Sequence, residues 1–127
     1  MVPHLIIEYT KNLEQDLNIN DLLKAMHAEL AKRTDIFPLG GIRVRAYPAE
    51  NYIIADGQEE DAFIHAALKI GGGRSDAEKN DAGKALFAAM TKTCQAIYEQ
   101  RYLGLSLEIS EFTHGTYKKN NIHARFS

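Results

Sequence analysis

The chain has 127 residues, of which 45% are hydrophobic and 25% are charged, as is typical of one globular domain with a hydrophobic core. Its formal net charge of -2 provides no positive field for nucleic acid or an anionic membrane surface, and no stretch approaches the roughly 20 apolar residues of a membrane span. One cysteine excludes an intrachain disulfide framework, and no signal-peptide pattern is present. We therefore expect a single cytoplasmic domain over residues 1–127, without nucleic-acid or membrane partners.

The first part of the chain predicts a strand followed by a helix. Residues 4–9 are rich in β-branched and aromatic side chains, which indicates a strand. After a polar stretch, apolar residues recur at helical spacing. This pattern predicts a helix of about three turns or more that ends before Pro38, with a stripe of Leu22, Leu23, Met26 and Leu30.

A second strand is predicted directly after a pair of glycines. Residues 41–47 alternate between apolar and polar side chains, so that Arg43 and Arg45 lie on one face of the strand. Residues 47–61 contain a proline and an Asp-Gly turn signal around a short apolar piece. We expect a loop with a brief strand there.

The second half repeats this plan with clearer boundaries. Residues 62–70 alternate and end at three glycines, which predicts a strand and a tight turn. Ser75 and Glu78 have the spacing of a capping box at the start of a helix that runs to about residue 101. Residues 105–112 alternate again and predict a further strand. The apolar stripe of this helix is predicted to be Ala82, Leu86, Met90, Thr93 and Ile97.

Two consecutive strand-helix-strand units predict an α/β (α+β) fold. The economical arrangement is a four-stranded mixed sheet with both helices on one face, which leaves the other face without cover. A small chain with one bare sheet face is expected to form oligomers.

Three arginines are candidates for binding an anion. Arg43 and Arg45 share one strand face, and the planar guanidinium fork suits carboxylates; a solvated surface with paired charges is the alternative. The glycine-rich stretch before Arg74 lacks the spacing of a phosphate-binding loop, and a tight turn explains its glycines. Arg74 could add a positive charge at the edge of a cleft.

The histidines and the cysteine do not predict a metal site. None of the five histidines has the spacing of a known metal-binding motif. Cys94 falls beside the apolar stripe of the second helix, where a small buried residue is expected rather than a nucleophile.

Five segments, in order along nearly the whole chain, carry a family resemblance. They are PHLIIEY from residue 3, IFPLGGIRVR from residue 36, ADGQEEDAFIHAALKIGGGRS from residue 55, LSLEISE from residue 105 and NNIHARF from residue 120. Together they resemble the 5-carboxymethyl-2-hydroxymuconate isomerase family of the tautomerase superfamily, which also contains macrophage migration inhibitory factor and 4-oxalocrotonate tautomerase.

This resemblance implies a fold of two β-α-β units and a homotrimer in which the sheets surround a central axis. It implies an isomerase that needs no cofactor and that moves a proton within an unsaturated hydroxy-acid. The dienol 5-carboxymethyl-2-hydroxymuconate, a small polycarboxylate, would become its conjugated keto isomer during the breakdown of homoprotocatechuate, an aromatic acid.

The resemblance also assigns roles to individual residues. Pro3 matches the proline that acts as the base, and Arg43 matches the catalytic arginine that holds a substrate carboxylate and stabilises negative charge. Arg45 and Arg74 stand where the family has arginines and are assigned to substrate binding. An α-amino group, with an ordinary pKa of roughly 7.7–8.0, becomes a useful base when nearby cations or burial lower that value.

The start of the sequence departs from the family pattern, in which the proline directly follows the initiator methionine. If Val2 remains in front of Pro3, the Pro3 nitrogen is an amide and cannot act as a base. Three explanations are open, of which we favour the first. Val2 is encoded by a natural GUG start codon that has been read as valine; or an aminopeptidase removes Met1 and Val2; or the chain is a trimeric binding protein without isomerase activity.

Overall fold

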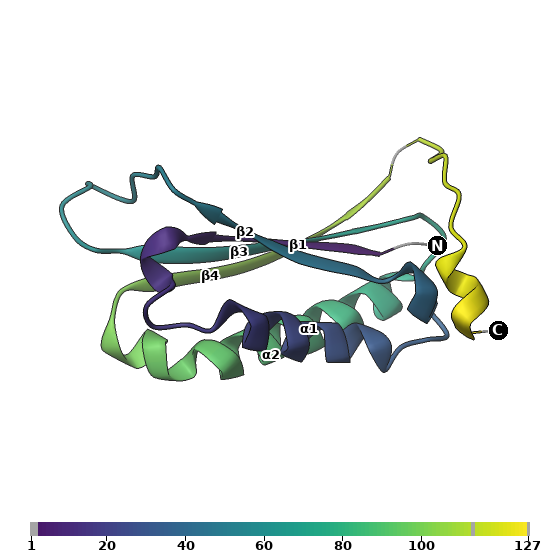
Figure 1. Ribbon diagram of the computed structural model, residues 1–127, viewed down its shortest axis with the longest axis horizontal. Helices are drawn as coiled ribbons and strands as arrows, with labels where there is room; N and C mark the ends of the chain where they lie inside the picture. The colour runs from purple at the N-terminus through teal and green to yellow at the C-terminus, as the bar shows by residue number, and fades with distance from the viewer. Residues whose placement is uncertain (1–2, 113, 127) are drawn as a thin grey trace.

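The computed structural model describes residues 3–112 and 114–126. Its four strands form one sheet in the order β2-β1-β3-β4, with β1 parallel to β2, β3 parallel to β4, and β1 antiparallel to β3. Both long helices cover the same face of this sheet (Figure 1). The predicted mixed sheet with two helices on one face is therefore confirmed. The strands are β1 (His4–Thr10), β2 (Arg43–Ala49), β3 (Ala62–Ile70) and β4 (Leu103–Glu111), and the helices are α1 (Ile19–Ala31) and α2 (Asp76–Gln100).

The predicted start of α2 is confirmed in detail. The Ser75 side chain accepts a hydrogen bond from the Glu78 backbone nitrogen at 3.1 Å, and the Glu78 carboxylate accepts one from the Ser75 backbone nitrogen at 2.9 Å. The helix buries Cys94, whereas Thr93 is only half-buried. The predicted stripe was thus wrong at this one position, because a period of 3.6 residues places residue 94 between the buried side chains of Met90 and Ile97.

The predicted loop after Tyr47 is confirmed, but the brief strand predicted around its short apolar piece is absent. β2 starts two residues later than expected, after a short 3-10 turn at Leu39–Gly41 (η2), and it continues to Ala49. Residues 50–61 then contain no strand. The strand tolerates Pro48 because β2 is an edge strand, where a missing backbone N–H group leaves no ladder bond unmade.

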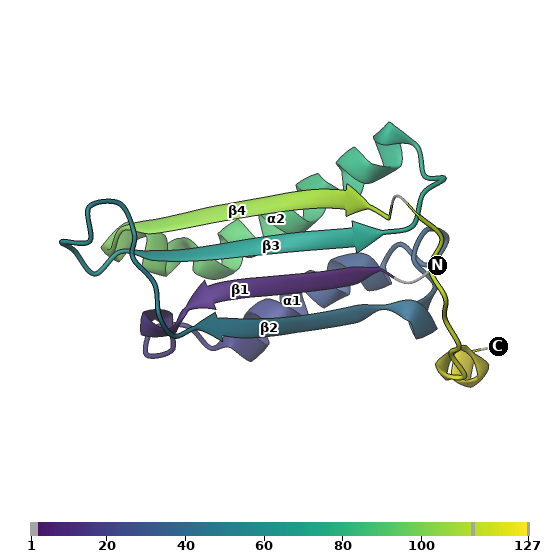
Figure 2. The same cartoon turned by 90° about the horizontal axis from the view of Figure 1, so that it is seen from above.

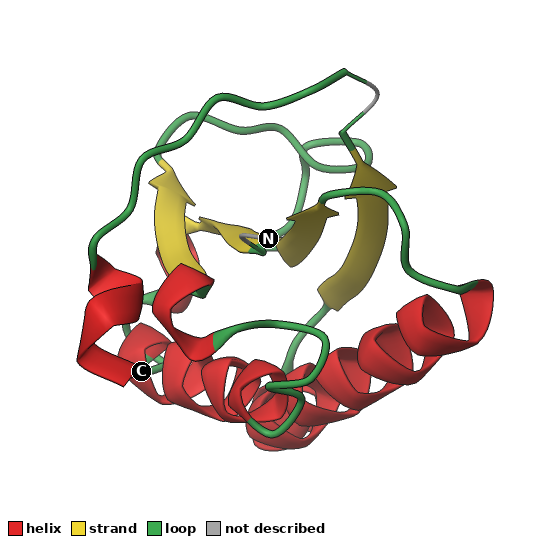
Figure 3. Ribbon diagram, turned by 90° about the vertical axis from the view of Figure 1, so that its right-hand side faces the viewer, coloured by secondary structure: helices red, strands yellow, loops and turns green. Residues whose placement is uncertain are grey.

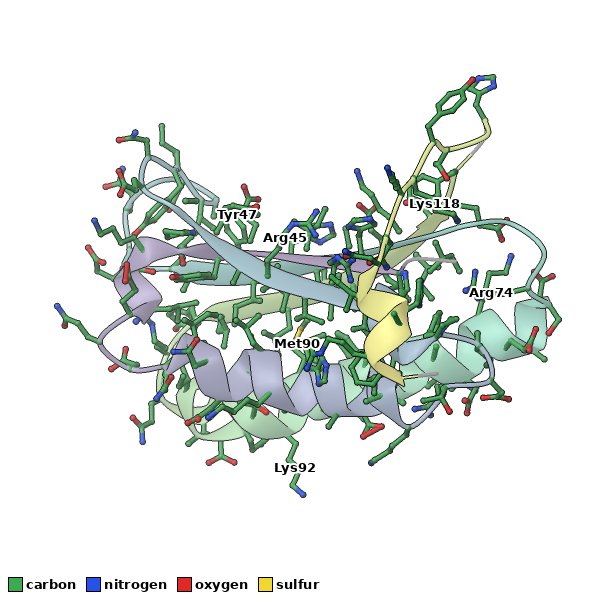
Figure 4. The ribbon with its side chains drawn as sticks, turned by 45° about the vertical axis from the view of Figure 1, so that its right-hand side comes forward. Arg45, Tyr47, Arg74, Met90, Lys92 and Lys118 are labelled. Atoms are coloured by element: carbon green, nitrogen blue, oxygen red, sulfur yellow. The ribbon has the colours of Figure 1, made fainter. Side chains whose placement is uncertain are left out.

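The core lies between the sheet and the two helices. Alternate residues of β1 and β3 point into it and are almost fully buried, and the alternation of residues 62–70 predicted this for β3. Met90 of α2 packs between the layers, whereas Arg45 and Tyr47 project from the opposite face of the sheet (Figure 4). The core side chains of the two central strands include Leu5, Ile7, Ile64, Ala66, Leu68 and Ile70.

One end of the sheet gathers segments that are far apart in the sequence. The starts of β1 and β2 and the ends of β3 and β4 meet there, and the chain after β4 passes close to the start of β1 (Figure 2). We call residues 112–126 the tail. Its last part, the 3-10 turn η3 (Ile122–Phe126), packs against η2 at the end of the sheet (Figure 3).

Gly40 makes the close contact between η2 and the tail. A Cβ atom at this position would lie 2.7 Å from the Cα atom of His123, closer than real Cβ contacts come. A glycine is therefore required here by the approach of the tail backbone rather than by a turn. In the described part of the chain, no helix is long and apolar enough to cross a membrane.

Candidate functional site

The strand register brings three cationic side chains and a histidine together on the face of the sheet away from the helices. His4 on β1 lies in register with Arg43 on β2 and with Lys69 on β3, and Arg45 follows two residues after Arg43. Their sequence neighbours, such as Leu5 and Leu68, point into the core. Because successive side chains of a strand alternate, the charged side chains face the open side.

Arg43 is held by the turn that precedes it. Its Nη1 atom donates to the carbonyl oxygen of Gly40 at 3.0 Å and to that of Ile42 at 3.2 Å. Its backbone nitrogen donates to the Pro3 carbonyl oxygen at 3.0 Å, which ties the start of β2 to the residue before β1. The guanidinium group has five N–H donors, so a fixed Nη1 atom leaves others for an anion.

A pocket of about 520 Å³ opens at this end of the sheet. His4 and Arg43 form one wall, the glycines after β3 and Phe112 form another, and residues 114–120 of the tail close the third. The lining contains Arg43, Lys118 and Lys119 but no carboxylate among the described residues. A pocket of this size and charge is suited to a small polycarboxylate.

The structure brings three of the four predicted site residues to this end of the sheet. Pro3 is buried directly before His4, Arg43 lines the pocket, and Arg45 lies beside His4. Met1 and Val2, on which the state of the Pro3 nitrogen depends, lie outside the described residues.

Arg74 occupies a different environment from the other arginines. Its Nη1 atom donates to the Gly71 carbonyl oxygen at 3.0 Å, and its Nη2 atom donates to the Ile36 carbonyl oxygen at 2.7 Å. Its guanidinium carbon lies 5.0 Å from the centre of the Phe37 ring, and burial lowers the pKa of the group. These contacts connect the β3–α2 turn to the segment before β2, and its assignment to substrate binding stays a prediction.

Sequence reasoning missed His4 as a site residue. Its Nδ1 atom lies 3.1 Å from Arg45 Nη1, and its ring makes an edge contact with Phe112 at 6.5 Å between ring centres. Burial lowers the pKa of the imidazole, and the charges of Arg45, Arg43 and Lys69 lower it further. The strand prediction for residues 4–9 assigned His4 to no face, and only the register with β2 shows that it lies on the same face as the arginines.

The tail residues at the pocket were also missed. Lys118 and Lys119 line the pocket, and Asn120 donates its side-chain amide to the Gly40 carbonyl oxygen at 3.0 Å. Their segment was interpreted only as turn residues before a short apolar piece. No pattern within residues 113–121 indicates that they return to the start of the sheet.

The described residues contain no group of three or more His, Cys, Asp or Glu side chains placed to hold a metal ion. Cys94 is fully buried in the core, where desolvation raises the pKa of its thiol to about 11.

Comparisons with known proteins show the family of this chain. The sequence profile described as 5-carboxymethyl-2-hydroxymuconate isomerase matches residues 3–126. A curated relative from Escherichia coli, a 5-carboxymethyl-2-hydroxymuconate Delta-isomerase, is 40% identical over 98% of this chain and 99% of its own length.

Solved structures give the same result. The crystal structure of a 5-carboxymethyl-2-hydroxymuconate isomerase from Deinococcus radiodurans R1 is 52% identical, with a TM-score of 0.93 over 98% of this chain and 94% of that one. A macrophage migration inhibitory factor from Trichinella spiralis is 12% identical, with a TM-score of 0.57 over 92% of this chain and 98% of that one. That likeness is one of fold alone.

Proposed function

The chain belongs to the 5-carboxymethyl-2-hydroxymuconate isomerase family and is an isomerase, and we propose that it converts 5-carboxymethyl-2-hydroxymuconate to its conjugated keto isomer without a cofactor. The pocket lined by His4 and Arg43, with cationic side chains and no carboxylate among its described lining residues, is the observation that carries this proposal. We place the reaction in the breakdown of homoprotocatechuate and in the cytoplasm.

In this mechanism Pro3 is the base. The unprotonated amine of Pro3 takes the proton of the substrate's 2-hydroxyl group, and the charge that remains spreads over the diene as a dienolate. The protonated amine then returns the proton to a carbon atom of the diene, which leaves a conjugated ketone and restores the amine. A base of this kind works best when its pKa lies near the working pH.

In our proposal, Arg43 stabilises the negative charge that develops on the dienolate. Its Nη1 atom donates to two backbone carbonyl groups, which hold the guanidinium in the pocket wall, and its backbone nitrogen donates to the Pro3 carbonyl oxygen. A positioned cation that faces developing negative charge lowers the barrier because it needs no reorganisation during the reaction. Lys118 and Lys119 provide further positive charge for the other substrate carboxylates.

We also propose a homotrimer. The face of the sheet away from the helices carries half-buried side chains, among them Ile6, Phe63 and Ala67. Within the described residues, no element covers the length of this face. The edge strands β2 and β4 have one unpaired side each. Both features favour contacts between copies, and a ring in which the β2 edge meets the β4 edge of the next copy satisfies every edge.

The experiment that tests the proposal compares two forms of the chain. A form that begins at Pro3 has a free amine, whereas a form in which Met1 and Val2 are kept has an amide at the same nitrogen. We expect the first form to convert the dienol at a rate that can be measured from the loss of the dienol's ultraviolet absorbance. The second form is expected to be about 100-fold slower or worse. Equal, negligible rates in both forms would contradict the isomerase proposal.

A third form controls for the length of the chain. A Pro3→Ala chain that begins at residue 3 keeps a free primary amine but loses the ring. We expect an intermediate rate from it, because the amine remains a base in the same place. Size measurement of all three forms, by sedimentation, tests the homotrimer independently of the activity.

A further inference from the structure

The arginine beside His4 determines which ring nitrogen carries the proton. Arg45 Nη1 lies 3.1 Å from His4 Nδ1. A guanidinium group only donates hydrogen bonds, so Nδ1 must accept, and an accepting imidazole nitrogen carries no proton. His4 is therefore a neutral imidazole with its proton on Nε2.

The surroundings of His4 oppose a second proton on the ring. The charged and titratable groups that face it are Arg43 and Arg45 from β2, Lys69 from β3, and His114, Lys118 and Lys119 across the pocket. Protonation would add a positive charge among cations, with no carboxylate of the described residues in the pocket lining to offset it. Desolvation and the charges of Arg45, Arg43 and Lys69 all lower the pKa of His4, which favours the neutral ring.

The other ring nitrogen is available to a ligand. His4 lines the pocket, and its hydrogen bond with Arg45 engages Nδ1. Among the described residues, no hydrogen bond to its Nε2 atom is found. Phe112 contacts the ring at an interplanar angle of 76° and limits its rotation. With these two contacts, the ring offers its Nε2–H donor to the pocket that it lines together with Arg43.

We propose that His4 is a further catalytic residue, whose Nε2–H group donates a hydrogen bond to the substrate oxygen that becomes negative as Pro3 removes the hydroxyl proton. Arg45 is then a positioning residue that acts through Nδ1. The inference rests on the proposed function. His4 keeps its own proton throughout, so the transferred proton still passes from the hydroxyl group to Pro3 and then to carbon.

A neutral donor has an advantage over another cation at this position. The substrate carboxylates already have arginine and lysine side chains to bind them, and these contacts are the same before and during the reaction. A donor aimed at the reacting oxygen strengthens its bond only as charge develops, and such an interaction raises kcat rather than lowering KM.

The first test observes the tautomer directly. In the chain that begins at Pro3, labelled with nitrogen-15 in its imidazoles, long-range proton–nitrogen correlation spectra at neutral pH should show His4 with its proton on Nε2 and a bare Nδ1. The His4→Gln spectrum assigns the signal. A proton on Nδ1, or on both nitrogens, would overturn the proposal.

The second test measures rates. We expect His4→Phe, which keeps the ring and removes the donor, to lower kcat about 100-fold with little change in KM, and His4→Gln, which restores an N–H donor, to recover part of that loss. His27→Phe makes the same change on the exposed face of α1 and should leave both constants unchanged. A His4→Phe enzyme with the kcat of the unchanged chain would overturn the proposal.

Arg45 variants separate positioning from structure. Arg45→Lys keeps a donor toward Nδ1 and should keep the Nε2–H tautomer, whereas Arg45→Met should produce a mixture of both tautomers and a fall in kcat. A single, unchanged tautomer in Arg45→Met would overturn the positioning role. Failure of the chain that begins at Pro3 to convert the substrate would instead contradict the proposed function. The tautomer measurement does not depend on that conversion.

Discussion

The side-chain amide of Asn120 and the carbonyl oxygen of Gly40 lie 3.0 Å apart, and Arg43 donates to the same oxygen at the same distance. One backbone carbonyl group thus joins the tail to the arginine of the pocket. The contact of Gly40 with His123 adds a second attachment for the tail at this point. The wall of the pocket and the orientation of Arg43 therefore depend on one glycine.

A Gly40→Ala substitution is expected to move the tail away from η2. The new methyl group would lie 2.7 Å from the His123 Cα atom, so the tail must move away. We expect a loss of about 1–3 kcal/mol in the free energy of unfolding, measured with urea, and a higher KM because the wall that carries Lys118 and Lys119 is displaced. Gly104→Ala is the control, since its nearest neighbour, the Phe63 Cβ atom, lies at an ordinary 3.9 Å. Equal effects of the two substitutions would contradict this account.

The Arg43 side chain is expected to affect the reaction far more than the fold. Arg43→Gln removes the charge beside Pro3, and we expect kcat/KM to fall about 100-fold or more because the dienolate loses a positioned cation. Arg43→Lys keeps a charge without the planar fork and should recover only part of the loss. Lys92→Gln removes a charge from the outer side of α2 (Figure 4) and should leave the rate unchanged. A similar fall in Arg43→Gln and Lys92→Gln would point to net charge instead of position.

The fold was largely predictable because each element carries its own local signal. Strict alternation in residues 62–70 gave β3 and its buried face, and the Ser75 and Glu78 spacing gave the start of α2. The extent of β2 was harder to predict from the sequence. Pro48 looks like a strand breaker, and only the position of β2 at the sheet edge, a tertiary fact, explains why the strand continues through it.

The site was predictable only in part, for a physical reason. Arg43 and Arg45 share a strand, so their common face followed from the sequence. Their meeting with His4 requires the register of β1 against β2, and the arrival of Lys118 requires the contact of the tail with Gly40, about 80 positions earlier in the chain. Such contacts have no local signature, because they depend on packing between distant segments.

The capping box at α2 is expected to make a measurable contribution to stability. Ser75→Ala leaves the Glu78 backbone nitrogen without its acceptor, and we expect a loss of about 1 kcal/mol in the free energy of unfolding. Ser75→Asn supplies another side-chain oxygen at the same place and should restore most of the loss. Urea unfolding followed by circular dichroism measures both. Equal stability of the alanine and asparagine variants would show that the cap contributes nothing.

The Cys94 thiol is expected to react only when the protein unfolds. The side chain is fully buried, and desolvation raises its pKa to about 11, so hardly any reactive thiolate exists in the folded protein at neutral pH. A thiol reagent should therefore modify the native chain slowly and the urea-unfolded chain quickly. A Lys92→Cys substitution in a Cys94→Ala background places a thiol on the exposed side of the same helix and should react at once.

The same shift of the Cys94 pKa predicts how the stability changes with pH. A folded-state pKa above the ordinary value of 9.0 means that the unfolded chain loses the thiol proton first. The corresponding contribution to stability is complete below about pH 9 and is lost as the pH rises toward 11. The free energy of unfolding of the unchanged chain should thus fall more steeply over this range than that of Cys94→Ala. Parallel pH profiles of the two proteins would show that the thiol titrates alike in the folded and unfolded states.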